Sequence, residues 1–108
     1  MIRLAEALPQ EPSAAIVGRQ LIRCATSVGA NYRAACRAKS KADMIAKLSI
    51  VEEEADECLY WLELLVESDL IPEAKVASLM TEINEIVAMI VASIKTLRSR
   101  QSNQKSKL

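Results

Sequence analysis

Two long runs of helically spaced apolar residues, separated by a short polar break, constrain the fold of this chain more than any other feature. The first run covers residues 13–36 and the second covers residues 41–68. In both runs the apolar side chains recur at steps of three and four, which keeps them on one side of an α-helix. The sequence therefore predicts two long antiparallel helices joined in a hairpin around residue 39.

The second of these helices has an unusually wide apolar face. Its two adjacent seams contain Met44, Ile45, Leu48, Val51, Glu52, Ala55, Cys58, Leu59, Leu62, Leu65 and Val66. Two adjacent seams indicate a helix that contacts neighbours on two sides, because a single neighbour covers only one stripe. At least one further long helix is therefore expected.

The flanking segments supply that helix and one shorter helix. Residues 2–8 read as a short helix stopped by Pro9, and Ser13 is a candidate N-cap for the next helix. Ser40 with Asp43 fits a capping box at the start of the third helix. We expect Pro72 to open the fourth helix at its first turn. The apolar seam of that helix ends at residue 97, and a polar, basic segment follows.

These elements predict an all-α fold, an antiparallel up-and-down four-helix bundle with a short first helix. We assign residues 1–98 to one bundle domain and residues 99–108 to a polar basic C-terminal tail that frays. The first helix spans about 12 Å and the third about 40 Å, at 1.5 Å per residue. Apolar surface therefore stays uncovered, and either residues preceding Met1 or another subunit must cover it.

The chain contains no histidine, and this decides against most catalytic and metal sites. A di-iron site in a helical bundle takes Glu-x-x-His from two helices, and Ser–His or Cys–His nucleophiles also need an imidazole. We therefore expect no enzymatic activity, no catalytic residue, no metal and no cofactor. The carboxylates between residues 52 and 57 are interpreted as a solvated or interface-facing stripe.

The remaining composition indicates a cytoplasmic protein that has no membrane partner. The N-terminus lacks a signal-peptide pattern, and the apolar run at residues 86–94 is far shorter than the roughly 20 residues that cross a bilayer. The three cysteines show no C-x-x-C spacing, which argues against a disulfide framework. Cys24 and Cys58 lie on apolar seams, so we interpret them as small core residues.

Charge is sorted along the chain although its formal net charge is zero. Basic residues dominate residues 19–47 and 86–108, and acidic residues dominate residues 48–85. Antiparallel pairing of the third and fourth helices brings both basic segments to one end of the bundle and places Glu67, Asp69 and Glu73 at the other. The candidate nucleic-acid-binding residues at the basic end are Arg33, Arg37, Lys39, Lys41, Lys47, Lys95 and Arg98, followed by the tail with Arg100, Lys105 and Lys107.

Pairing within the hairpin also predicts a structural polar network. A turn centred near residue 39 sets Arg23 level with the acidic stripe, so we expect an ion pair from Arg23 to Glu54 or Glu57. Asn31 lies in an apolar seam, where a single Asn often fixes helix register. We predict that Arg23 and Asn31 are largely buried and that their role is structural, in preference to ligand binding.

Residues 13–71 resemble the four-helix bundle proteins first noticed as products of intervening sequences in bacterial 23S ribosomal RNA genes. The matching pieces are GRQLIR (residues 18–23), TSVGANYRAACRAKSKADMIAKL (residues 26–48) and EEADECLYWLELL (residues 53–65). The resemblance implies an antiparallel bundle, a ring-like homo-oligomer that is commonly a pentamer, and no established enzymatic activity. A branch with a similar fold, the accessory proteins of diversity-generating retroelements, forms pentameric barrels that engage a reverse transcriptase and nucleic acid.

The expected function is therefore that of a non-enzymatic, homo-oligomeric scaffold or adaptor, whose partner is another copy of the chain or another protein. The alternative is a weak, largely non-specific RNA- or DNA-binding protein that uses a basic rim of the oligomer. The absence of an aromatic platform near the basic cluster, apart from Tyr32, favours phosphate attraction over base recognition.

Overall fold

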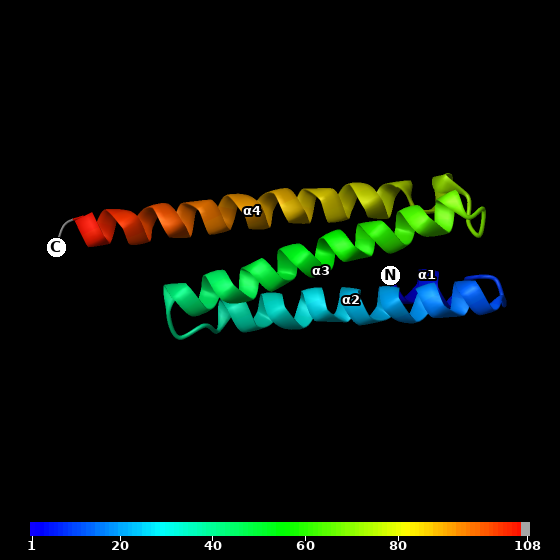
Figure 1. The fold of residues 1–108 in the computed structure, drawn as a ribbon, viewed down its shortest axis with the longest axis horizontal. Coiled ribbons are helices and arrows are strands. Elements are labelled where there is room, and N and C mark those ends of the chain that lie inside the picture. The colour runs from blue at the N-terminus through cyan, green and yellow to red at the C-terminus, as the bar shows by residue number, and fades with distance from the viewer. Residues whose placement is uncertain (107–108) are drawn as a thin grey trace.

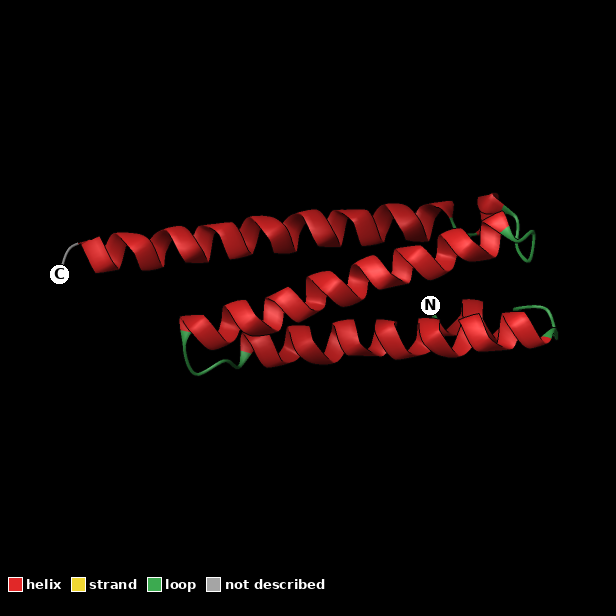
Figure 2. Cartoon of the chain, in the orientation of Figure 1, coloured by secondary structure: helices red, strands yellow, loops and turns green. Residues whose placement is uncertain are grey.

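The computed structural model describes the backbone of residues 1–106 and the side chains of residues 1–100. It contains a short helix α1 (Ile2–Glu6), three long helices and a 3₁₀ turn η1 (Glu73–Lys75), with no strand in the described part of the chain (Figure 2). The long helices are α2 (Pro12–Cys36), α3 (Lys41–Glu67) and α4 (Ala77–Ser106). The predicted helical hairpin is confirmed within two residues at each end of its two helices.

Helix α3 occupies the centre of an elongated molecule of 59 × 21 × 16 Å. It runs between α2 and α4 and packs against both, whereas α2 and α4 scarcely touch each other (Figure 1). The short α1 packs on α2. This arrangement uses both apolar seams of α3, one for each long neighbour.

The core consists of two apolar clusters at different heights of the bundle. The larger cluster surrounds Leu21, Leu62 and Leu65, and side chains of α1 pack against it. The smaller cluster joins Ala35 and Val51 to residues of α4, and no residue of α1 reaches it. Cys24 and Cys58 are buried, as expected. The described part of the chain buries no polar or charged residue.

Two of the predicted helix starts differ from the structure. Helix α2 begins at Pro12 with Glu11 as its N-cap, not at Ser13, because the fixed φ of proline suits the first helical position. Pro72 does not open α4. Its backbone is extended, with ψ of 143°, and it precedes η1, after which Val76 is completely buried. The Ser40 cap is confirmed, because its hydroxyl accepts the Asp43 N–H at 3.0 Å.

The end of α4 also differs from the expectation that the chain frays from Ser99. The helix continues to Ser106 and extends past the α2–α3 turn in Figure 1. The division into a domain of residues 1–98 and a tail of residues 99–108 stays a prediction. The side chain of Lys105 and the whole of Lys107 lie outside the described residues.

Gly18 allows the close approach of α1 to α2. A Cβ at this position would lie 3.2 Å from Leu8 Cδ1, whereas a Cβ at Gly29 would meet nothing within 4 Å. Both glycines lie inside α2, where glycine costs about 0.5–1 kcal/mol relative to alanine. The packing of α1 accounts for the glycine at position 18, whereas no neighbouring atom accounts for the glycine at position 29.

We predict that Gly29→Ala stabilises the protein by about 0.5–1 kcal/mol. Gly18→Ala should give a smaller gain, or none, because its methyl group displaces Leu8. Urea unfolding followed by circular dichroism measures both variants. Equal gains from the two substitutions would contradict the tight seating of α1 on Gly18.

Candidate functional site

An apolar groove of about 470 Å³ lies between α2 and α4 and has α3 as its floor. Its residues are Tyr32, Ala35, Cys36, Met44, Leu48, Met89, Ile90, Ala92, Ser93, Thr96, Leu97 and Arg100. Tyr32 and Met89 are about half exposed, at 47% and 56%. The groove is therefore an open surface of the single chain.

The groove continues the position that α1 occupies in the bundle. Helix α1 packs against Gly18, and Cys36 follows Gly18 by about five helical turns, so both face the same side of α2. Figure 1 shows the N-terminus partway along α2, which runs on beyond it. The fourth-helix position is thus filled beside the first half of α2 and open beside the second half.

Helix α4 exposes more apolar surface than a helix of a four-helix bundle normally does. On its other side from Met89, Val91 is 44% exposed and lies in a shallow hollow with Glu52. By length and composition alone, residues 77–100 would suffice to cross a membrane, and only 17% of the most apolar window of this helix is buried. The helix is therefore not explained as a fully buried core helix, and its apolar residues are open to a partner; Glu82 and Glu85 lie among them. The expectation of no membrane partner stays a prediction.

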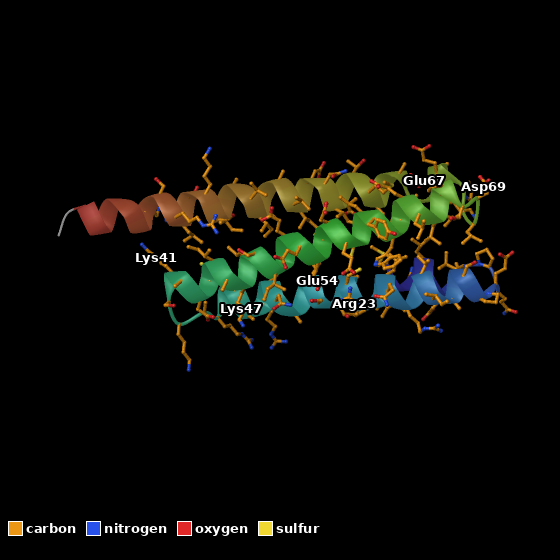
Figure 3. The ribbon with its side chains drawn as sticks, in the orientation of Figure 1. Arg23, Lys41, Lys47, Glu54, Glu67 and Asp69 are labelled. Carbon is orange, nitrogen blue, oxygen red and sulfur yellow. The ribbon has the colours of Figure 1, made fainter. Side chains whose placement is uncertain are left out.

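The predicted separation of charge along the molecule is visible in the structure. Lys41 lies at one end of α3, and Glu67 and Asp69 lie at the other (Figure 3). Among the other basic candidates, Arg33, Arg37, Lys39, Lys95 and Arg98 are exposed, and Lys41 and Lys47 are half-buried. The basic end therefore exists, with side chains that are available to solvent.

These basic side chains do not form one continuous patch. Lys95 and Arg98 line the hollow that contains Glu52, whereas Arg100 lines the apolar groove. Lys47 lies more than a helical turn along α3 from the end marked by Lys41. The sequence predicted the shared end correctly, but helix periodicity distributes the side chains around it.

The predicted ion pair of Arg23 is confirmed. Its Nη1 lies 3.1 Å from Glu54 Oε2, its Nη2 contacts Glu57 Oε2, and its Nε donates to Gln20 Oε1 at 3.0 Å. The hydrogen bond from Arg23 holds the pKa of the Glu57 carboxyl below its ordinary value of 4.5. Figure 3 shows Arg23 and Glu54 on facing helices, α2 and α3.

The predicted burial of Arg23 is wrong. The Arg23 side chain is 47% exposed, because its long stem lets the guanidinium bridge the helices from the edge of the hairpin. Asn31 is half-buried, and its amide donates to Ser27 O at 2.9 Å and Ser27 Oγ at 3.1 Å within α2. Both of these hydrogen bonds stay within α2, and the register role of Asn31 stays a prediction.

Tyr60 and Trp61 are adjacent on α3, and their rings lie edge to face with centroids 4.9 Å apart. Tyr60 is 55% exposed, whereas Trp61 is half-buried and packs against the larger core cluster. The buried indole Nε1 has no acceptor with standard hydrogen-bond geometry. Trp61 also contributes weakly to the lowered pKa of the nearby Glu57 carboxyl. Tyr60 is thus the aromatic residue that faces outward.

In the part of the chain with described side chains, no three Cys, Asp or Glu residues converge in a way that could hold a metal ion. The carboxylates of the acidic stripe point outward or toward Arg23, and the cysteines form a separate pair. This geometry does not test the prediction that the protein is not an enzyme, which stays a prediction.

The model of the 23S rRNA-intervening sequence protein family matches residues 1–92. The chain belongs to this family. The matched residues include α1, α2, α3 and α4 as far as Ala92, which lines the groove. The family resemblance read from the hairpin is therefore confirmed.

A solved structure also resembles this family member. It is a protein of unknown function from the S23 ribosomal protein family of Bacteroides thetaiotaomicron, which is 37% identical and superposes with a TM-score of 0.80. The likeness covers 87% of this chain and 84% of the other. No curated protein matches the sequence. The helical-bundle fold class is confirmed by this neighbour together with the all-helical structure.

The Arg23 network makes the stability of this family member depend on pH in a defined direction. Because the pKa of Glu57 is lowered in the folded state, the stabilisation is present above the unfolded pKa near 4.5 and is lost as pH falls through the folded pKa. We predict that Arg23→Gln lowers the urea midpoint at pH 7, and that the difference from wild type disappears at a pH where Glu57 is protonated.

Arg19→Gln is the matched control, because Arg19 is exposed on the same helix and forms no ion pair among the described side chains. Its midpoint should follow wild type at every pH. A deficit of Arg23→Gln that persists undiminished in acid would show that the ion pair is not its cause.

Proposed function

We propose that this protein is a non-enzymatic, homo-oligomeric scaffold or adaptor of the cytoplasm. The single observation that carries the proposal is the apolar groove, which leaves half of the fourth-helix position uncovered. A contiguous apolar surface of this kind is unusual on a monomeric soluble protein and marks an interaction site. The occupant that best fits is a helix, because the groove is lined by α2, α3 and α4 and continues the position of α1 in the bundle.

A second copy of the chain is the proposed occupant. Each copy exposes apolar side chains on both flanks of α4, Met89 on the groove side and Val91 on the other. Such a surface can contact two neighbours at once, and a heterologous contact that repeats around an axis closes a ring. The pentamer implied by the family resemblance is one such ring. In this arrangement the apolar stretch of α4 faces protein, with no membrane involved.

We predict that light scattering gives the purified protein a mass several times 11.9 kDa. Met89→Glu should reduce that mass at equal concentration, because it places a charge on the apolar groove, and should leave the helical content unchanged. The control is Thr81→Glu on the outer side of α4, where the threonine is exposed. A wild-type protein that stays monomeric at micromolar concentration would remove the proposal.

The alternative is weak, largely non-specific binding of RNA or DNA at the basic end. The exposed basic side chains that share this end support it, since phosphate neutralisation alone gives salt-dependent affinity with little sequence preference. In a ring of parallel copies, each copy would add its basic end to the same rim. The acidic stripe and the zero net charge keep the expected affinity low.

We predict that replacing Arg37, Lys39 and Lys41 together by Gln abolishes the retardation of labelled RNA at about 50 mM salt, where charge contacts are strong. The chain offers a control with the same change in net charge. Arg3, Arg19 and Lys75 lie away from the basic end and are exposed. Replacing these three by Gln should preserve retardation. If the unmodified protein retards no RNA, the nucleic-acid alternative fails and only the scaffold proposal remains.

A further inference from the structure

Helices α2 and α3 bring two cysteines into contact inside the core. Cys24 and Cys58 are 0% and 2% exposed, and their Sγ atoms lie 3.2 Å apart although 34 positions separate them in sequence. The third cysteine, Cys36, is exposed and lines the groove, so it does not take part in this contact. The two buried thiols form a pair on opposite sides of one helix–helix seam.

We propose that Cys24 and Cys58 are an oxidative modification site, which a hydroperoxide converts into an intramolecular disulfide between α2 and α3. The sulfur atoms need to approach by about 1.2 Å to reach bonding distance. Rotation of the two side chains supplies a movement of this size, without separation of the helices. The two sulfur atoms are already in contact across the seam, and a disulfide requires side chains that point toward each other.

The hydrogen bonds decide which sulfur reacts first. The Cys58 thiol donates to Cys24 Sγ, so a Cys24 thiolate keeps a hydrogen-bond donor, although it gives up the bond that the Cys24 thiol donates to Gln20 O at 3.0 Å. Burial raises the pKa of both thiols. At Cys24 the hydrogen bond from Cys58 opposes that rise, while the charges of Glu57 and Glu54 add to it and that of Arg23 opposes it; at Cys58 the contact with Cys24 adds to the rise. Cys24 is therefore the attacking thiol, and Cys58 is the resolving thiol.

The chemistry balances in two steps. The Cys24 thiolate attacks the terminal oxygen of hydrogen peroxide, the O–O bond breaks, and the departing hydroxide takes up the thiol proton to leave as water. Cys58 then attacks the sulfenic sulfur, the S–S bond forms, the S–O bond breaks, and a second water leaves. One peroxide is reduced to two waters while two thiols are oxidised to one disulfide.

Access to the pair is controlled by the Arg23 network. Arg23, Glu54 and Glu57 lie close enough to Cys24 to influence its pKa, and their ion pairs hold α2 to α3 at the solvent edge beside it. Because both sulfurs are buried and mostly protonated, reaction requires transient opening of this edge. The site is consequently slow, and it responds to sustained oxidation.

The test uses Cys36→Ser protein, in which only the pair remains. Hydrogen peroxide should convert two titratable thiols into none, without intermolecular species, and dithiothreitol should restore them. The oxidised form should melt about 15 °C higher, because the bond closes a long loop. Cys36→Ser with Cys58→Ser, whose hydroxyl can still donate to Cys24 Sγ, should trap a sulfenic acid at Cys24 with dimedone faster than Cys36→Ser with Cys24→Ser traps one at Cys58. Equal trapping, or faster trapping at Cys58, would overturn the assignment of roles.

A second measurement does not depend on whether peroxide can reach the buried thiols. Cys36→Ser protein is unfolded in urea and refolded in a glutathione redox buffer, where the thiols are exposed during folding. The disulfide should form with native helical content. If both thiols stay free, or if the oxidised protein loses helix or melts below the reduced form, the pair is core packing only and the proposal fails. Neither outcome depends on oligomerisation, so the scaffold proposal is tested separately.

Discussion

The structure depends on the burial of both apolar seams of α3. This central helix contacts α2 on one side and α4 on the other. Because each outer helix packs its apolar face against α3, α2 and α4 make almost no contact with each other. Leu62 and Leu65 are completely buried within one cluster and Val51 within the other. The same arrangement explains the open groove, since a central helix flanked by two others leaves a fourth position that α1 fills only in part.

The charged residues at the two ends of α3 oppose the stability of this helix. Lys41 lies at the N-terminus of α3 and Glu67 at its C-terminus, where each opposes the helix dipole by about 0.3–1 kcal/mol. Burial of apolar surface is much larger, at about 1.5–3 kcal/mol for each large side chain, so the helix tolerates the unfavourable charges. The result is a molecule with opposite charge at its two ends.

Periodicity in the sequence was enough to predict the hairpin, the register of the Arg23 ion pair and the shared basic end, because each follows from helix geometry. Local details were not accessible in the same way. Asn31 found its acceptor one turn back in its own helix, and Pro72 adopted an extended backbone. The predicted register set Cys24 level with the acidic stripe and missed Cys58 by about one turn. The contact between the cysteines therefore required three-dimensional information, as did the position of the groove.

The separation of the core into two clusters has a consequence for local unfolding of the bundle. Side chains of α1, α2, α3 and α4 all pack around the larger cluster, whereas only three helices enclose the smaller one. Local opening is easiest where the fewest elements enclose the buried side chains. Backbone amides beside Ala35 and Ile94 should therefore exchange with solvent through partial unfolding, while those beside Leu62 exchange only when the whole chain unfolds. One end of the molecule can thus rearrange around a neighbour while the other end keeps the fold intact.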